Sequence, residues 1–236
     1  MKEYIITIDS GSTLNIDDCN KYNIIPLRRE YIFNDKVFKD NLNTNEYSLY
    51  YKNVRKGIKP TLLNINQYVY LDFWYKYLLE GKQILHFSIG SKEYKSACQA
   101  KSTFEEMFNK KVITIINPKN DIFSAGVLAI EASKYRDQNL DLETTCDKIT
   151  QRINSLKVYD LDNKSKKSLG INIKNLKNTC TNQSYCYIVH SDNIMMAKKY
   201  GKILKNKYGI NNIKYSYVSP YKIDKTNINQ VKFYCL

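Results

Sequence analysis

The chain has 236 residues, 43% of them hydrophobic, and a formal net charge of +14. This length suits one large domain or two smaller ones with a full hydrophobic core. No apolar run approaches the roughly eighteen residues that cross a bilayer, and Asp9 interrupts the first apolar run, so we expect neither a membrane span nor a secretion leader.

The six cysteines show no metal-ligand spacing such as CxxC. They are Cys19, Cys98, Cys146, Cys180, Cys186 and Cys235. In a chain of this length they are typical of reduced thiols, which predicts a cytoplasmic protein. Both histidines, His86 and His190, lie within strand-like sequence, so we predict no zinc site and no other cofactor.

The basic surplus is concentrated in the C-terminal third of the chain. Residues 158–236 carry 14 basic and 4 acidic side chains, whereas residues 1–157 carry 23 and 19. Of the 37 basic residues 32 are Lys, which lacks the bidentate geometry of Arg toward phosphate. We therefore interpret the charge as a solvated lysine surface in preference to a nucleic-acid-binding face.

The first forty residues read as a strand, a polar turn and a second strand. Tyr4–Ile8 is apolar and β-branched and is followed by the polar Asp9–Thr13. A helical run over Asn15–Lys21 leads to a strand at Ile24–Leu27 and to the amphipathic segment Tyr31–Phe38. Ligands of open α/β sheets bind beyond the carboxyl ends of the strands, so Asp9–Thr13 is a candidate site.

Helices and strands alternate through the middle of the chain. The apolar periodicity predicts helices over Gln67–Leu79, Ser91–Phe108, Ile122–Tyr135 and Thr144–Leu156, and strands over Gln83–Phe87 and Lys111–Ile116. In the second helix we expect Tyr94, Ala97, Cys98, Phe104 and Phe108 to face inward. Such alternation predicts an α/β fold with a mostly parallel sheet that helices cover on both faces.

A shift in composition near Val158 predicts two domains, an α/β domain over residues 1–157 and a smaller, basic α/β domain over residues 158–236. Residues 160–182 read as a linker or a weakly structured segment. Beyond them we predict strands at Tyr185–His190, Ile213–Val218 and Val231–Cys235, and a helix over Asn193–Tyr208 that ends at Gly209.

Four polar loops are expected to gather at one end of the strands: Asp9–Thr13, Lys59–Asn66, Ser88–Ser91 and Ser219–Asn229. Ser91 opens a helix, so we predict that it caps the helix N-terminus, either alone or together with a ligand contact. Asp9 is interpreted as tying its own turn through the backbone; the alternative is a catalytic acid.

Several short motifs recur in the order found in one family. They are Ile8-Asp9-Ser10, Ile25-Pro26-Leu27, the acidic-aromatic segment Asn34–Asp40, the helix opening Phe87–Ala97, the helix entry Asn117–Ala129 and the strand end Val189-His190-Ser191-Asp192. In these motifs the chain resembles the DegV family of bacterial two-domain α/β proteins, which bind a fatty acid between their domains. The resemblance covers residues 1–157 and 184–222 and implies a DegV-like fold with a shortened, truncated C-terminal domain.

The resemblance also implies a set of ligand-binding residues, with departures. The family threonine that binds the fatty-acid carboxylate falls on Leu62, with Thr61 adjacent, and the family serine is retained as Ser91. The family histidine falls near Lys225, and the Gly-Arg-Ile segment has no counterpart. We therefore predict a carboxylate site formed by Ser91, Ser88, Thr61, Lys225, Asp9 and Ser10.

The resulting hypothesis is a non-catalytic protein that holds a long-chain fatty acid, or a similar amphipathic carboxylate, between its domains. The resemblance implies a fatty acid kinase as partner. The alternatives are a degenerate member that binds a different small anion, or a basic nucleic-acid- or partner-binding module. An enzyme is disfavoured because the sequence has no GxSxG, P-loop or GxGxxG motif.

The aromatic residues suit either a lipid tunnel or a filled core; they are Tyr31, Phe33, Phe73, Trp74, Tyr77, Phe87, Phe104, Phe108 and Phe123.

Overall fold

The structure is a computed structural model in which the chain forms two compact units. It describes residues 4–33, 35–43, 46–47, 50, 52–53, 56–58, 60–118, 124–155, 157–160, 186–190, 194–211, 213–217 and 231–235. The first unit comprises Met1–Asn43 and Lys59–Ile153, and the second comprises Thr44–Ile58 and Asn154–Leu236. The division into domains 1–157 and 158–236 stays a prediction.

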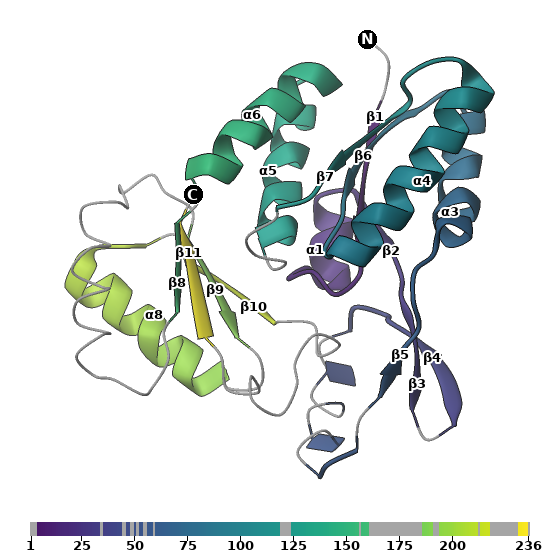
Figure 1. The fold of residues 1–236 in the computed structure, drawn as a ribbon. Helices are drawn as coiled ribbons and strands as arrows, with labels where there is room; N and C mark the ends of the chain where they lie inside the picture. The colour runs from purple at the N-terminus through teal and green to yellow at the C-terminus, as the bar shows by residue number, and fades with distance from the viewer. Residues whose placement is uncertain are drawn as a thin grey trace. The chain divides into compact units, whose positions relative to one another are not determined.

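A four-stranded parallel sheet forms the centre of the first unit (Figure 1). Its strands are β1 (Tyr4–Asp9), β2 (Ile24–Leu27), β6 (Gln83–Phe87) and β7 (Ile113–Ile116), in the order β2-β1-β6-β7. All three pairings are parallel, and the register of β1 and β6 places Thr7 opposite His86. The predicted parallel sheet is confirmed.

Helices cover both faces of this sheet. They are α1 (Ile16–Lys21), α3 (Gln67–Leu79), α4 (Ser91–Phe108), α5 (Ser124–Asp137) and α6 (Leu142–Ser155). Figure 1 shows α3 and α4 on one face and α5 on the other. Asn15 and Asn66 cap α1 and α3, since each side-chain oxygen accepts backbone N–H groups of the first turn. Both α3 and α4 have the predicted bounds.

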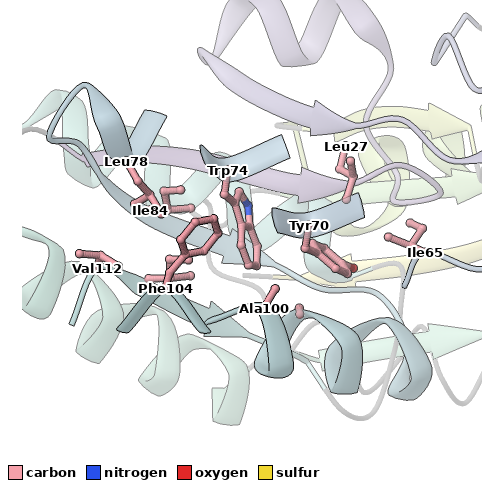
Figure 2. Close-up of a cluster of buried hydrophobic side chains, with 11 residues drawn as sticks. Leu27, Ile65, Tyr70, Trp74, Leu78, Ile84, Ala100, Phe104 and Val112 are labelled. Atoms are coloured by element: carbon pink, nitrogen blue, oxygen red, sulfur yellow. The ribbon is translucent and has the colours of Figure 1, made fainter. Parts of the chain in front are cut away.

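The main core of the first unit lies between the sheet and the helices α3 and α4 (Figure 2). Trp74 of α3 and Phe104 of α4 are almost completely buried there. Ala97, Ala100 and Phe104 form the inward stripe of α4. Tyr94 is 37% exposed, so its predicted inward position was wrong. Its hydroxyl lies beside the partly buried Cys98, one helical turn later.

A small antiparallel sheet adjoins the parallel sheet within the first unit. It contains β3 (Glu30–Phe33), β4 (Lys36–Lys39) and β5 (Thr61–Leu62), in the order β4-β3-β5. The ring of Tyr31 stacks on that of Phe38 with 5.6 Å between the centroids. The amphipathic Tyr31–Phe38 segment is therefore a hairpin, held by cross-strand aromatic contacts.

The second unit contains a mixed sheet with the order β10-β9-β11-β8. Its described elements are β8 (Lys157–Asp160), β9 (Cys186–His190), α8 (Ile194–Tyr208), β10 (Ile213–Tyr217) and β11 (Val231–Cys235). Strands β9 and β10 are parallel, whereas β11 is antiparallel to both β9 and β8. Strand β8 was not predicted, and the predicted linker lies almost entirely outside the described residues.

The nine aromatic residues that could line a tunnel or fill a core are buried or partly buried where the structure describes them. Trp74, Phe87 and Phe104 are buried in the first unit, which supports the core interpretation for these three. The partly buried ones are Tyr31, Phe33, Phe73, Tyr77 and Phe108, and Phe123 lies outside the described residues. In the part of the chain that the structure describes, no helix has the length and apolar character to span a membrane.

Candidate functional site

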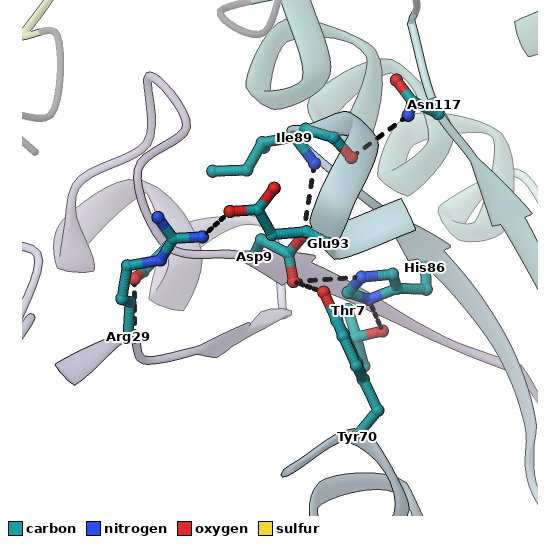
Figure 3. A network of polar contacts seen from close by, with 10 residues as sticks. Thr7, Asp9, Arg29, Tyr70, His86, Ile89, Glu93 and Asn117 are labelled. Carbon is teal, nitrogen blue, oxygen red and sulfur yellow. Dashed lines mark hydrogen bonds and ion pairs between the residues drawn. The ribbon is translucent and has the colours of Figure 1, made fainter. Parts of the chain in front are cut away.

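A buried carboxylate, Asp9, lies at the carboxyl end of β1 and connects three elements of the first unit (Figure 3). The Tyr70 hydroxyl from α3 donates to its Oδ1 at 2.8 Å. The backbone N–H of Ile89, directly beyond β6, donates to its Oδ2 at 3.2 Å. Strand β1 has β2 on one side and β6 on the other, so Asp9 lies at the switch point of the sheet, where α/β proteins bind ligands.

His86 completes the surroundings of the Asp9 carboxylate. Its Nε2 lies 3.2 Å from Asp9 Oδ1, and its Nδ1 lies 2.9 Å from Thr7 Oγ1. The rings of Tyr70 and Trp74 meet the imidazole edge-on, with centroids 5.4 and 5.1 Å away. All of these side chains are buried, so this network is fixed by packing as well as by hydrogen bonds.

The Asp9 carboxyl is held in its ionised form. Burial is the largest single influence and opposes ionisation, but the contact with His86 and the hydrogen bonds from Tyr70 and Ile89 together outweigh it. The pKa of Asp9 is consequently below its usual value. Burial, followed by the adjacent Asp9 charge, raises the pKa of the Tyr70 hydroxyl, which stays protonated and able to donate. Among the described residues, Asp9 accepts from Tyr70 and Ile89 and makes no hydrogen bond to residues 10–13, so the expectation that it ties its own turn was wrong.

Ser10 and Arg29 link the ends of β1 and β2. The Ser10 N–H donates to Leu27 O at 2.8 Å, and the Ser10 Oγ accepts from the Arg29 N–H at 2.8 Å. The Arg29 guanidinium forms an ion pair with Glu93 in the first turn of α4, and both side chains are largely buried (Figure 3). The polar turn is thereby joined to the start of α4.

Ser88 and Ser91 bring two hydroxyl groups to the segment between β6 and α4. The Ser88 side chain is fully buried, and its Oγ has no hydrogen-bond partner among the residues that the structure describes. The N-cap of α4 is Gly90, which provides no side-chain bond, so the prediction of Ser91 as the cap was wrong. Gly90 has an extended backbone and directly precedes Ser91. Ser91 is the first helical residue and is exposed. The first-turn amides of α4 therefore lack a side-chain acceptor.

The structure brings together four of the six predicted site residues. Asp9, Ser10, Ser88 and Ser91 lie on the two loops that leave the adjacent strands β1 and β6. Thr61 lies in β5, where it pairs with Ile32 of the hairpin, and it is exposed. Lys225 lies outside the described residues, as does the loop around it.

The sequence reasoning missed Thr7, His86, Tyr70 and Arg29 as members of this network. Thr7 and His86 are polar residues within otherwise apolar strands, and they are opposite each other in the register. A polar residue buried in a strand needs a partner, so this pairing was the available signal. Tyr70 gave no such signal, because a tyrosine on the apolar stripe of a helix is ordinarily a core residue.

A parallel sheet with a polar network at its switch point, together with a second α/β unit, defines a two-unit α/β protein. The family model described as "Uncharacterised protein, DegV family" matches residues 4–161. The chain belongs to the DegV family. A search of curated proteins found no significant match.

The fold resembles several solved structures at low sequence identity. A DegV lipid-binding protein from Thermotoga maritima has a TM-score of 0.78 at 16% identity, with 99% of this chain and 98% of that chain covered. A second Thermotoga maritima protein, described as revealing a fatty-acid-binding function, has the same TM-score and identity, with 100% and 99% covered. DegV from Bacillus subtilis, described as a fatty-acid-binding protein, has a TM-score of 0.78 at 12% identity, with 100% and 99% covered. These similarities confirm the DegV-like fold.

Proposed function

We propose that this protein is a non-catalytic binding protein for a long-chain fatty acid or a similar amphipathic carboxylate. The observation that carries the proposal is the buried Ser88 hydroxyl, which has no protein partner at the switch point of the sheet. A buried hydroxyl without a partner is costly, and a ligand oxygen would satisfy it. The fatty-acid-binding descriptions of the similar structures supply the ligand class.

The surroundings of Ser88 suit a carboxylate headgroup. The first-turn amides of α4 have no side-chain cap, and helix N-termini favour anions. Ser91 adds a second hydroxyl in that turn, and the Ser10 hydroxyl retains its hydrogen for donation. We assign these three serines to the headgroup and leave Thr61 and Lys225 as additional proposed contacts.

Asp9 has a different part in this proposal. Its ionised carboxylate would repel a ligand carboxylate at close range, and its oxygens are already occupied by Tyr70, Ile89 and His86. We therefore propose that Asp9 positions the Ser88–Ser91 loop through the Ile89 amide. The same occupancy argues against a role as catalytic acid, because a proton-transfer group must reach its substrate.

The test is lipid extraction followed by binding. Purified full-length protein is denatured, and the extract is analysed by mass spectrometry; a fatty acid near one equivalent is expected. Delipidated protein is then titrated with palmitate. Ser88→Ala and Ser91→Ala should each raise the Kd about ten- to a hundredfold, because a hydrogen bond to a charged group contributes about 1.5–3 kcal/mol. Ser102→Ala is the matched control, since its hydroxyl donates to Cys98 O within α4.

Two results would overturn the proposal. One is the absence of both co-purified fatty acid and palmitate binding. The other is unchanged palmitate affinity in the Ser88→Ala, Ser91→Ala double variant, which would place the carboxylate elsewhere.

The proposal extends to a partner, a fatty acid kinase that phosphorylates the bound carboxylate. Its support is membership of the DegV family, together with the exposed position of Ser91 at the proposed headgroup site. Incubation of the palmitate-loaded protein with ATP and a bacterial fatty acid kinase should yield acyl phosphate. Equal yield without this protein would contradict the extension.

A further inference from the structure

A pocket of about 560 Å³ lies within the first unit, apart from Ser88 and Ser91. It is bounded by the β2–β3 connection, by Lys39 of β4, by residues 63–66 and by the first turns of α3. Its volume lies within the range of small-molecule sites, which is roughly 300–1,000 Å³. Neither Ser88, Ser91 nor Asp9 contributes to its lining.

Part of the pocket lining is apolar. Leu27 and Ile65 belong to the buried core (Figure 2). Phe73 of α3 packs against that core. Tyr68, at the start of α3, is 70% exposed and adds a second aromatic ring to the lining. This part of the lining can therefore receive a flat apolar group without disturbing the core.

The lining also contains three cations. Arg29 is the most buried of them, with a side chain 6% exposed, and its Nε–H has no acceptor among the described residues although its Nη2 pairs with Glu93. Arg28 and Lys39 also line the pocket, and neither forms an ion pair with any described residue. A buried guanidinium N–H without an acceptor is as costly as an unpaired hydroxyl and is suited to a planar carboxylate.

Two acidic residues share the lining and restrict the ligand. Glu30 is opposite Lys39 in the hairpin register, and Asp72 lies one turn into α3. Counting Glu93, which pairs with Arg29 from outside the lining, the three cations are matched by three carboxylates. A single negative charge is therefore favoured only through local contacts such as the Arg29 Nε–H. A multiply charged anion such as a nucleotide is disfavoured by both carboxylates.

We propose that this pocket is a second ligand site, which binds a small monocarboxylate with an aromatic or short apolar body. The carboxylate lies against Arg29, with Arg28 and Lys39 at the rim, and the body lies on Leu27, Ile65 and Phe73. The site is lined by residues other than Asp9, Ser88 and Ser91, and it adjoins the proposed fatty-acid headgroup site through Arg29, whose backbone N–H donates to Ser10 Oγ.

The test uses three probes that share one body and differ in charge. Full-length protein is titrated by calorimetry or ligand-observed NMR with 3-phenylpropionate, 3-phenylpropan-1-ol and 3-phenylpropylamine. The acid is expected to bind at least tenfold more tightly than the alcohol or the amine. Arg28→Gln combined with Lys39→Gln should weaken acid binding at least tenfold, whereas the control Lys36→Gln, on the same hairpin but not in the lining, should leave it unchanged.

Each contrary result has a definite meaning. Equal binding of acid and alcohol, stronger binding of the amine, or no binding of any probe would overturn the proposal. The proposal would also be overturned if the Ser88→Ala, Ser91→Ala double variant lost acid binding while the Arg28→Gln, Lys39→Gln double variant kept it. The acid would then occupy the fatty-acid site. Failure of palmitate binding alone would leave this pocket unaffected and would concern only the proposed function.

Discussion

The Tyr70 hydroxyl donates to Asp9 Oδ1 over 2.8 Å, and this bond joins the first turn of α3 to the end of β1. Both side chains are buried, so the bond has no competition from water. It fixes α3 relative to the sheet edge at which we place the ligand. The stability and ligand affinity of the protein should therefore depend on this contact.

Tyr70→Phe tests this contact by removing only the hydroxyl. The ring keeps its packing on Trp74, at a centroid distance of 5.0 Å, while the buried carboxylate loses one donor. Hydrogen bonds to charged groups contribute about 1.5–3 kcal/mol, so we expect the free energy of unfolding in urea to fall by about 2 kcal/mol. Tyr75→Phe, at a 47% exposed position on the same helix, should change it by less than about 0.5 kcal/mol. Equal effects of the two substitutions would contradict the assigned role.

Asp9→Asn should be more damaging than Tyr70→Phe. It removes the charge and places an amide where the structure has only an acceptor for Tyr70 and Ile89. Each hydrogen bond to a charged group contributes about 1.5–3 kcal/mol, so we expect the free energy of unfolding by chemical denaturation to fall by about 3–5 kcal/mol. A variant with full stability that loses a measurable catalytic activity would instead support the acid role for Asp9.

Acid pH should reproduce part of this loss in the unmodified protein. The folded-state pKa of Asp9 is below its usual value of 3.8, so the unfolded state binds the proton more tightly. The stabilisation by ionised Asp9 is then present above about pH 3.8 and is lost as the pH falls through the lower folded-state pKa. Thermal unfolding measured from pH 6 to pH 2 should show a higher stability for the unmodified protein than for Asp9→Asn. This difference in stability should disappear only at the lowest pH values. A constant difference across this range would contradict the assignment.

The helices and strands of the first unit were predictable because their signals are local. The bounds of α3, β6 and α4 agree with prediction. Asn66 before α3 and Gly81 after it mark its ends, and β6 is a short, mostly apolar run that is buried from Ile84 to Phe87. Strand β8 escaped prediction because Lys157–Asp160 is polar and pairs with β11, about seventy residues later in the chain.

The candidate site was predictable in position but not in chemistry. Parallel strands bring their carboxyl ends to one edge, so the closeness of Asp9 and the Ser88–Ser91 loop follows from the order of elements. The partners of Asp9 depend on the register of β1 against β6 and on the rotation of α3, which no local pattern specifies. The burial of Arg29 was hidden for the same reason, because its partner Glu93 lies 64 positions away.

The Arg29–Glu93 ion pair should be important for stability. The side chains are 6% and 13% exposed, so removal of one charge leaves the other uncompensated in a poorly hydrated site. We expect Glu93→Gln to lower the free energy of unfolding by about 3 kcal/mol, with little dependence on salt. Glu106→Gln, at an exposed position on the same helix, is the control and should cost less than about 0.5 kcal/mol. A loss at Glu93 that disappears in high salt would indicate a solvated surface pair instead.

Gly126 of α5 provides the last prediction, because it lets the polar turn after β1 approach the helix. A Cβ at this position would lie 2.4 Å from Thr13 Oγ1 and 3.1 Å from both the Thr13 backbone N and Leu14 Cγ. Gly126→Ala should therefore lower the free energy of unfolding by about 1–3 kcal/mol, although alanine is favoured over glycine by about 1 kcal/mol within a helix. Thr13→Ser keeps the hydroxyl oxygen and should not relieve the clash. Thr13→Gly in the Gly126→Ala background should recover part of the lost unfolding free energy. Denaturant titration of the unmodified protein, Gly126→Ala, Thr13→Gly and the double variant checks this coupling. Strict additivity of the Gly126→Ala and Thr13→Gly effects would show that the two positions are not in contact.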